Sequence, residues 1–180
     1  VFQDGEHFKL WPIFWVPEEA ANKRERQNRM KFNEWIRREH MLTTPGNAID
    51  HAFIRKTIND LSRVVNLKKI NYDPWNAEQL ATELRHQDGI ETVECRQGYR
   101  SMSEPTKMLL ARLADGKIEH PNNPCLNWMA SNFSTDEDPA GNLKPSKKKS
   151  SEKIDGIVAA IMALGLAALN RNEEPQLILL

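Results

Sequence analysis

A run of apolar residues near the C-terminus constrains the fold more than any other part of this sequence. From Ile157 to Leu169 the chain reads IVAAIMALGLAAL, without a single charged side chain. A helix that is apolar on all sides has to be buried inside a domain. The run is too short to cross a bilayer, because a transmembrane helix needs about 20 apolar residues. We therefore predict a buried central helix and no membrane partner.

The beginning of this helix carries a candidate catalytic acid. Ser150 and Ser151 offer an N-cap, and Glu152 falls in the expected first turn, where a negative charge suits the helix dipole. Small residues three or four apart predict a smooth face that can approach a sheet closely; they are Gly156, Ala160, Ala163 and Ala167. Asp155 is the only acid inside the block. It is either an acid that complements the helix N-terminus or a metal ligand on a rigid element, and the residues leave both open.

Length and charge limit the remaining possibilities. The 180 residues fit one domain with a real core. The 25 basic and 25 acidic residues balance, so a polyanionic partner would have to bind a local patch. The two cysteines, Cys95 and Cys125, lack the spacing of a metal site. We expect free thiols in a reducing compartment and no zinc site.

The middle of the chain has the pattern of a β-α-β unit. We expect a strand over Lys69–Tyr72, a helix over Ala77–His86 and a strand over Ile90–Cys95, a pattern that favours parallel strands with a right-handed crossover. A further amphipathic helix is expected over His51–Val65. Sites in open sheets gather at the carboxyl ends of strands, and Asp73 directly follows such an end. The alternative for Asp73 is an ordinary acid in a strand-ending turn.

The first third of the chain has weaker patterns. Asp4-Gly5 predicts a hairpin turn, followed by an edge strand over Glu6–Val16 that Pro12 interrupts. A charged helix from Pro17 to about His40 offers a basic face, which either contacts a nucleic-acid backbone or is solvated. A short strand is expected at Asn47–Ile49, and another hairpin over residues 133–144.

Basic side chains concentrate directly before the apolar helix. This cluster comprises Lys144, Lys147, Lys148 and Lys149. Arg96 and Arg100 lie on either side of Tyr99 in a polar loop. Both groups are candidates for contact with a DNA backbone, and both could equally be solvated loops.

Five segments carry a family resemblance. They are Tyr72–Ala77 (YDPWNA), Arg96–Lys107 (RQGYRSMSEPTK), His120–Met129 (HPNNPCLNWM), Asp138–Pro145 (DPAGNLKP) and Lys153–Ala159 (KIDGIVA). Taken in this order, they resemble the nuclease domain of tailed-phage or prophage terminase large subunits. The resemblance covers nearly the whole chain.

The resemblance implies an α/β fold, an RNase H-like mixed sheet flanked by helices. It also implies a metal-dependent endonuclease that cuts concatemeric double-stranded DNA during genome packaging, with two Mg²⁺ or Mn²⁺ ions. Asp73 and Asp155 match the second and third acids of that family. Its first acid lies in an Asp-Leu-Ser-like motif on the first strand, whereas Asp60-Leu61-Ser62 falls within an expected helix and Asp4 in a turn.

The missing first acid shapes the expected domain organisation. We expect a nuclease domain over residues 1–170 that lacks its first strand, then a C-terminal tail over 171–180, and little or no cleavage by this chain alone. The family implies the following partners: double-stranded DNA, a terminase small subunit, a portal protein and an ATPase domain of the same polypeptide. It implies the bacterial host cytoplasm as the location.

Two other classes remain open. One is another RNase H-like nuclease of the resolvase or transposase type, against which Gln97–Lys107 and His120–Met129 argue. The other is a non-catalytic DNA-binding or assembly module, which would be favoured if the full-length protein also lacks the first acid.

Overall fold

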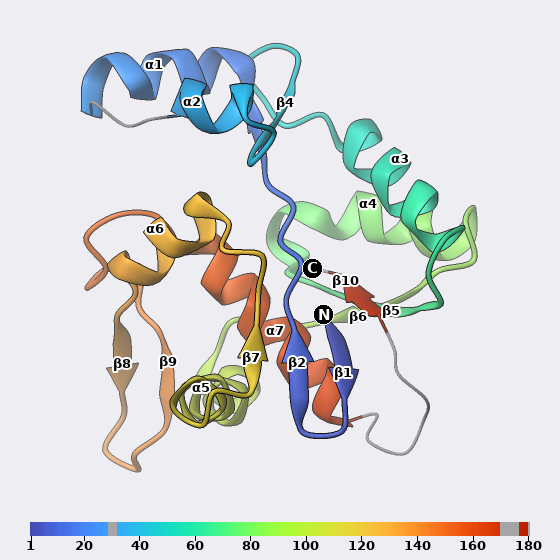
Figure 1. Cartoon of the computed structure of the whole chain (residues 1–180). Helices are drawn as coiled ribbons and strands as arrows, with labels where there is room; N and C mark the ends of the chain where they lie inside the picture. The colour runs from blue at the N-terminus through green and yellow to red at the C-terminus, as the bar shows by residue number, and fades with distance from the viewer. Residues whose placement is uncertain (29–31, 170–176, 180) are drawn as a thin grey trace.

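A mixed six-stranded sheet forms the framework of the protein. The computed structural model describes residues 1–28, 32–169 and 177–179. The strands lie in the order β6-β5-β10-β1-β2-β7 (Figure 1). Their bounds are Phe2–Asp4 (β1), His7–Lys9 (β2), Leu67–Tyr72 (β5), Glu91–Glu94 (β6), Ile118–Glu119 (β7) and Leu177–Leu179 (β10).

Two parts of this sheet agree with the sequence patterns. Strands β1 and β2 form the expected antiparallel hairpin, and Gly5 in its turn has a φ of 58°, which a glycine adopts without strain. Strands β5 and β6 are parallel and are joined by α4 (Pro74–His86), as the β-α-β pattern predicted. The carboxyl ends of β5 and β6 therefore lie at one edge of the sheet.

The segment expected to be a tail contributes a strand to the middle of the sheet. Strand β10 pairs in parallel with β5, and Leu177 pairs with Phe2 of the antiparallel neighbour β1. The backbone of residues 177–179 thus joins the hairpin to the β-α-β unit. Residues 170–176, which the expected tail also includes, lie outside the described part.

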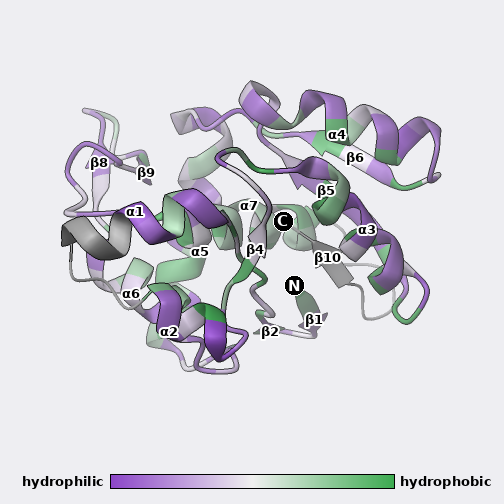
Figure 2. Ribbon diagram, turned by 90° about the horizontal axis from the view of Figure 1, so that it is seen from above, coloured by the Kyte–Doolittle hydropathy of each residue, from purple (hydrophilic) through white to green (hydrophobic). Residues whose placement is uncertain are grey.

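The apolar run forms helix α7 (Asp155–Leu169), and it is the core of the domain, as predicted. Ile161, Ala163 and Leu164 are completely buried. Helix α7 packs against α5 (Tyr99–Ala114) and α6 (Pro124–Asn132). Seen from above, it is an apolar segment surrounded by more hydrophilic helices (Figure 2).

The predicted cap of this helix is wrong. Helix α7 begins at Asp155, so Ser150, Ser151 and Glu152 all precede it. The Ser150 hydroxyl instead donates to the Ser146 carbonyl at 2.7 Å, and the Ser151 hydroxyl donates to Asn132 at 2.9 Å. The Ser150 bond stabilises a local turn before α7, as serine hydroxyls commonly do with nearby backbone carbonyls, and the Ser151 bond links this segment to the end of α6.

The small residues of α7 allow close packing, mainly against other helices. A Cβ atom at Gly156 would lie 2.7 Å from the ring of Phe14 and 2.9 Å from the sulfur of Met129. At Gly165 it would lie 2.6 Å from Cγ of Pro105, in α5. Helix α7 also contacts strands β5 and β10 of the sheet, and Asn71 of β5 donates a hydrogen bond to the Met162 carbonyl.

A smaller unit joins the main sheet through the segment after β2. It contains α1 (Glu18–Asn28), α2 (Phe32–Arg37) and a parallel pair of strands, β3 (Trp15–Pro17) with β4 (Leu42–Thr44). The rings of Phe32, Trp35 and Trp128 pack together and attach this unit to α6.

Three sequence predictions differ from the structure in this unit. The strand expected over Glu6–Val16 is divided into β2 and β3, which belong to different sheets. Pro12 lies in the connection and has no N–H for a ladder. The strand expected at Asn47–Ile49 lies earlier, at Leu42–Thr44. The single helix expected to His40 is observed as α1 and α2, and residues 29–31 lie outside the described part.

The remaining elements follow the predictions. Strands β8 (Thr135–Glu137) and β9 (Leu143–Pro145) form the second hairpin. Helix α3 (His51–Ser62) is capped by Asp50, whose carboxylate accepts a hydrogen bond from the Ala52 N–H at 2.9 Å. Within the described residues, no helix has the length and apolar character needed to cross a membrane.

Gly165→Ala should destabilise the fold by about 1–2 kcal/mol, although alanine is the better helix former, because the new methyl group overlaps Pro105. Chemical denaturation measures the change. In a Pro105→Ala background the same substitution should cost less, because Cγ at 2.6 Å is removed while Cβ at 3.2 Å remains, and an equal loss in both backgrounds would contradict the assigned contact.

Asp88→Asn should destabilise the protein at pH 7 more than at pH 3. Arg55 donates to both Asp88 oxygens at 2.7 and 2.8 Å, and these hydrogen bonds lower the pKa of the Asp88 carboxyl. The stabilisation is present above the ordinary carboxyl pKa and is lost as the pH falls through the lowered value. Thermal melting of both proteins at the two pH values tests this, and a difference independent of pH would exclude the ion pair as its cause.

Candidate functional site

Asp73 is held by hydrogen bonds to both of its carboxylate oxygens. It follows the last residue of β5 and caps α4, with Oδ1 accepting from the Trp75 N–H at 3.2 Å. Oδ2 accepts from Nε2 of Gln97 at 2.7 Å. Pro74 at the first helical position preorganises this cap. The local cap and the more distant Gln97 together fix the direction of the carboxylate.

Asp155 is the first residue of α7 and is paired with a lysine. Its Oδ1 lies 3.1 Å from Nζ of Lys147, and more than half of each side chain is exposed. Because it is exposed, the ion pair contributes little to stability. The burial of the helix nevertheless fixes the backbone position of Asp155.

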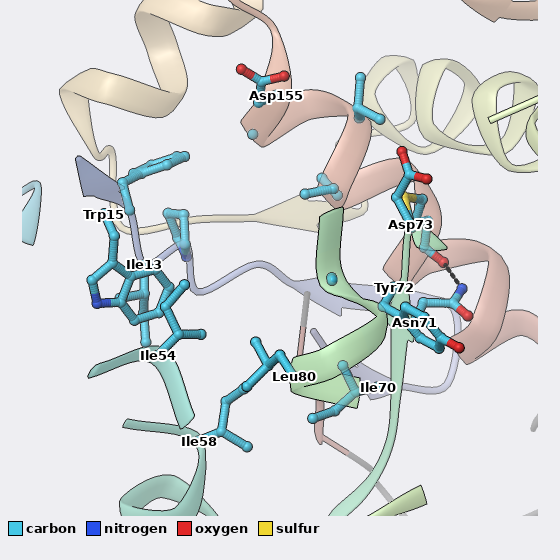
Figure 3. Close-up of a pocket in the computed structure, with 18 of the residues that line it drawn as sticks. Ile13, Trp15, Ile54, Ile58, Ile70, Asn71, Tyr72, Asp73, Leu80 and Asp155 are labelled. Carbon is cyan, nitrogen blue, oxygen red and sulfur yellow. Dashed lines mark hydrogen bonds between the residues drawn. The ribbon is translucent and has the colours of Figure 1, made fainter. Parts of the chain in front are cut away.

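Both acids line one cavity of about 450 Å³. Figure 3 shows Asp73 and Asp155 on the same side of this cavity, with the apolar side chains of Ile54, Ile58 and Leu80 on the other. The structure thus brings the two predicted site residues to a common space. That they lie within reach of a bridging metal ion stays a prediction.

One buried hydrogen bond connects the elements that carry these acids. Nδ2 of Asn71, in β5, donates to the Met162 carbonyl of α7 at 2.8 Å (dashed in Figure 3). Asn71 is two residues before Asp73, and Met162 is two turns beyond Asp155. Oδ1 of Asn71 is buried and has no hydrogen-bond partner among the described residues. This link fixes where the carboxyl end of β5 lies along α7.

The two acids suit a hard divalent cation. Carboxylate oxygens are the ligands that Mg²⁺ and Mn²⁺ favour. Within residues 1–28, 32–169 and 177–179 there is no group of three or more His, Cys, Asp or Glu placed to hold a metal. The described chain therefore supplies a pair of acids and no larger acidic cluster.

The lysine cluster lies beside the acids. Lys144, Lys147 and Lys148 line a smaller cavity of about 270 Å³ together with Gln97. Lys144 lies over the ring of Tyr99, 4.7 Å from its centroid, and Lys149 pairs with Asp136 at 2.9 Å. These contacts hold the cluster against the site. DNA contact by the four lysines stays a prediction.

The two arginines lie in and after the loop that follows β6. Arg96 pairs with Glu94 at 2.6 Å and is largely exposed. With Asp73, Trp75 and Gln97 it lines an open depression. Arg100 lies in the first turn of α5. Contact of these two arginines with DNA also stays a prediction.

Gln97 is the site residue that the sequence patterns missed. In the sequence it falls within a polar loop and a family motif, and neither pattern indicates a role for its side chain. The signal that points to it is topological: the loop after β6 begins at the same sheet edge as Asp73, because β5 and β6 are parallel.

The cysteines have no part in this site's chemistry. Both are free thiols, as expected. Burial raises the pKa of Cys125 to about 12, and burial together with the negative charge of Asp73 raises the pKa of Cys95. Both side chains are therefore neutral thiols near pH 7, a poor state for a nucleophile or zinc ligand.

A known protein family matches almost the whole chain. Residues 1–171 match the model of the terminase large subunit endonuclease domain. The chain therefore belongs to the terminase large subunit endonuclease family, as the five segments predicted.

Individual relatives support this assignment. The terminase large subunit of Enterobacteria phage HK97 is 29% identical over 168 residues, which cover 91% of this chain and 33% of that protein. Protein YmfN of Escherichia coli K12 is 29% identical over 179 residues, covering 95% of this chain and 39% of YmfN. The large subunit of Lactococcus phage p2 is 32% identical over 142 residues, covering 76% and 26%. The chain thus spans between a quarter and two-fifths of the length of these relatives.

Solved structures establish the fold. The crystal structure of the HK97 large terminase superposes with a TM-score of 0.81 at 28% identity, over 89% of this chain and 34% of that one. The large terminase nuclease of the thermophilic phage G20c, solved with bound magnesium, gives 0.51 at 18% identity, over 66% and 62%. The domain therefore has an RNase H-like α/β fold, and the predicted fold class is confirmed.

Proposed function

We propose that this chain is the catalytic part of a metal-dependent endonuclease that cuts concatemeric double-stranded DNA during viral genome packaging. The observation that carries the proposal is the shared cavity of Asp73 and Asp155. Family membership supplies the reaction class, hydrolysis of a phosphodiester bond.

In this proposal Asp73 and Asp155 hold divalent cations, two Mg²⁺ or Mn²⁺ ions. Such ions supply Lewis-acid stabilisation of the charge that develops on phosphate oxygens, and they favour a nucleophilic water at neutral pH. The magnesium found in the G20c nuclease supports this choice of metal. The protein's own task is to place and orient both carboxylates, to which the hydrogen bond from Gln97 to Asp73 and the ion pair of Lys147 with Asp155 contribute.

Lys147 has one role before a cation binds and another after it has bound. Its ammonium group lies where it balances the charge of Asp155, 3.1 Å from Oδ1. A cation held by Asp155 would compete with this pair, and the flexible lysine is then free to turn toward a DNA phosphate. The neighbouring lysines extend the basic surface along the same side.

The full assembly follows from the family. We propose that the complete polypeptide carries a packaging ATPase domain, works with a terminase small subunit and a portal protein, and acts in the bacterial host cytoplasm. A non-catalytic DNA-binding or assembly module is the second candidate, and it would be favoured if the complete polypeptide lacks the first acid that the family implies.

Asp73→Asn or Asp155→Asn should lower metal-dependent DNA cleavage by at least about 100-fold, since a neutral amide cannot replace a charged metal ligand. Asparagine at 73 still accepts the cap hydrogen bond, so the fold should be kept. The assay measures plasmid cleavage by the full-length polypeptide with Mg²⁺ or Mn²⁺. Asp115→Asn, at the exposed C-terminal end of α5, is the control and should cleave normally.

These variants separate the two candidate functions. Near-normal DNA cleavage by either folded site variant would show that the substituted acid is not a metal ligand of the site. If the unaltered full-length polypeptide binds DNA but never cleaves it with any divalent cation, the non-catalytic module is the better conclusion.

Replacing Lys147, Lys148 and Lys149 together with alanine should weaken DNA binding about equally for all sequences. Each lost phosphate contact should reduce the slope of log affinity against log salt by about one unit. Fluorescence anisotropy at several salt concentrations measures this slope. A charge-matched control replaces Lys9, Lys56 and Lys117, which line neither the cavity of the acids nor the smaller cavity of the lysine cluster. Equal slopes for the two triple variants would assign DNA contact to other residues, with Arg96 and Arg100 tested next.

A further inference from the structure

We propose that Gln97 is a positioning residue that orients Asp73 for cation binding. The inference rests on the proposed function, since it concerns how the same acid is prepared for its metal. Its basis is the 2.7 Å hydrogen bond from Nε2 of Gln97 to Oδ2 of Asp73. That bond is partly buried and joins residues on two different loops at the site.

The two hydrogen bonds to Asp73 restrict its carboxylate to one orientation. The Trp75 N–H holds Oδ1, and the Gln97 amide holds Oδ2. Without Gln97 the cap bond alone would remain, and the carboxylate could rotate about its last torsion, which has a broad energy minimum. Each carboxylate oxygen keeps a further lone pair for a cation after accepting one hydrogen bond. Gln97 therefore fixes the orientation of the Asp73 carboxylate and leaves lone pairs on its oxygens for a cation.

Chemistry decides which end of the Gln97 amide faces Asp73. An ionised carboxylate only accepts hydrogen bonds, so the NH₂ end must point toward it. A neutral donor adds no charge to the site, so it orients the acid without competing with a cation. A lysine at this distance would compete with the cation for the carboxylate. Outer partners of this kind commonly change metal affinity by about 10- to 100-fold when they are removed.

The loop that carries Gln97 is itself well anchored. Tyr72 and Glu94 are register partners in the parallel pair β5–β6, and the Cys95 N–H donates to the Tyr72 carbonyl at 2.9 Å. Beyond Gln97, the Gly98 N–H donates to the Arg96 carbonyl at 2.8 Å. These backbone bonds present Gln97 at the sheet edge where Asp73 ends its strand. The donor is thus held by the backbone on both sides of the residue.

Gln97 also touches both halves of the site. It lines the cavity of the two acids and the smaller cavity of the lysine cluster. A residue that served only to cap α4 would have no need of this position, because the Trp75 N–H already completes that cap. The position of Gln97 between Asp73 and the lysine cluster suits a residue that orients the Asp73 carboxylate as a metal ligand.

The test is Gln97→Met in the full-length polypeptide, because methionine keeps the length of the side chain and removes the donor. Binding of Mn²⁺ in the absence of DNA is followed by the electron paramagnetic resonance signal of the free ion. We expect the dissociation constant to rise about 10- to 100-fold while the thermal midpoint stays close to that of the unaltered protein. The midpoint of cleavage against Mg²⁺ concentration should rise by a similar factor, with partial recovery at saturating metal.

Gln79→Met is the matched control. Gln79 also donates through Nε2 to a carboxylate, Glu83, at 3.1 Å, but this pair lies on α4 outside the cavity of the acids. The control should leave Mn²⁺ binding unchanged.

The outcomes distinguish this inference from the proposal beneath it. If Asp73→Asn weakens Mn²⁺ binding and Gln97→Met does not, the positioning role is rejected and the metal site stands. A Gln97→Met protein with a lower thermal midpoint and unaltered Mn²⁺ affinity would reduce Gln97 to a structural contact. If Asp73→Asn binds Mn²⁺ as tightly as the unaltered protein, both the metal site and the role of Gln97 are overturned.

Discussion

Burial of α7 is the constraint on which the rest of the structure depends. A helix with no polar face must be covered on every side, and α5, α6, Phe14 and the sheet provide that cover. Its glycines let these neighbours come close, so their positions are tightly determined. A rigid helix of this kind gives its first residue, Asp155, a fixed place although the side chain itself is exposed.

The site arises where this buried helix meets the edge of the sheet. Asn71 ties β5 to the middle of α7 by a hydrogen bond in the interior, where losing a partner is costly. The same strand ends at Asp73, so one buried contact sets the relation between two acids near the surface. Gln97 and Lys147 then act on the two carboxylates in different ways, one as a neutral donor and the other as a charge. This division leaves one acid oriented and the other electrostatically balanced.

Sequence patterns succeeded where a local rule decides the structure. The all-apolar run predicted α7, the amphipathic pattern that begins at His51 predicted α3, and Asp4-Gly5 predicted the first hairpin. They failed where several local rules compete. Ser150 and Ser151 have the chemistry of helix caps, yet their hydroxyls bond to Ser146 and Asn132, and the helix starts later. The strand expected at Asn47–Ile49 was displaced because pairing with β3 selects Leu42–Thr44.

By itself the sequence determined the buried helix, the β-α-β unit and the identity of the two candidate acids, because each depends on residues close together in the chain. The family resemblance extended this to the fold class. Only the tertiary structure decided that Asp73 and Asp155 share a cavity, that Gln97 holds Asp73, and that residues 177–179 enter the sheet between β5 and β1. These features depend on hydrogen bonds and packing between segments far apart in the chain, and no local pattern specifies which distant partner a polar group or a strand edge will find.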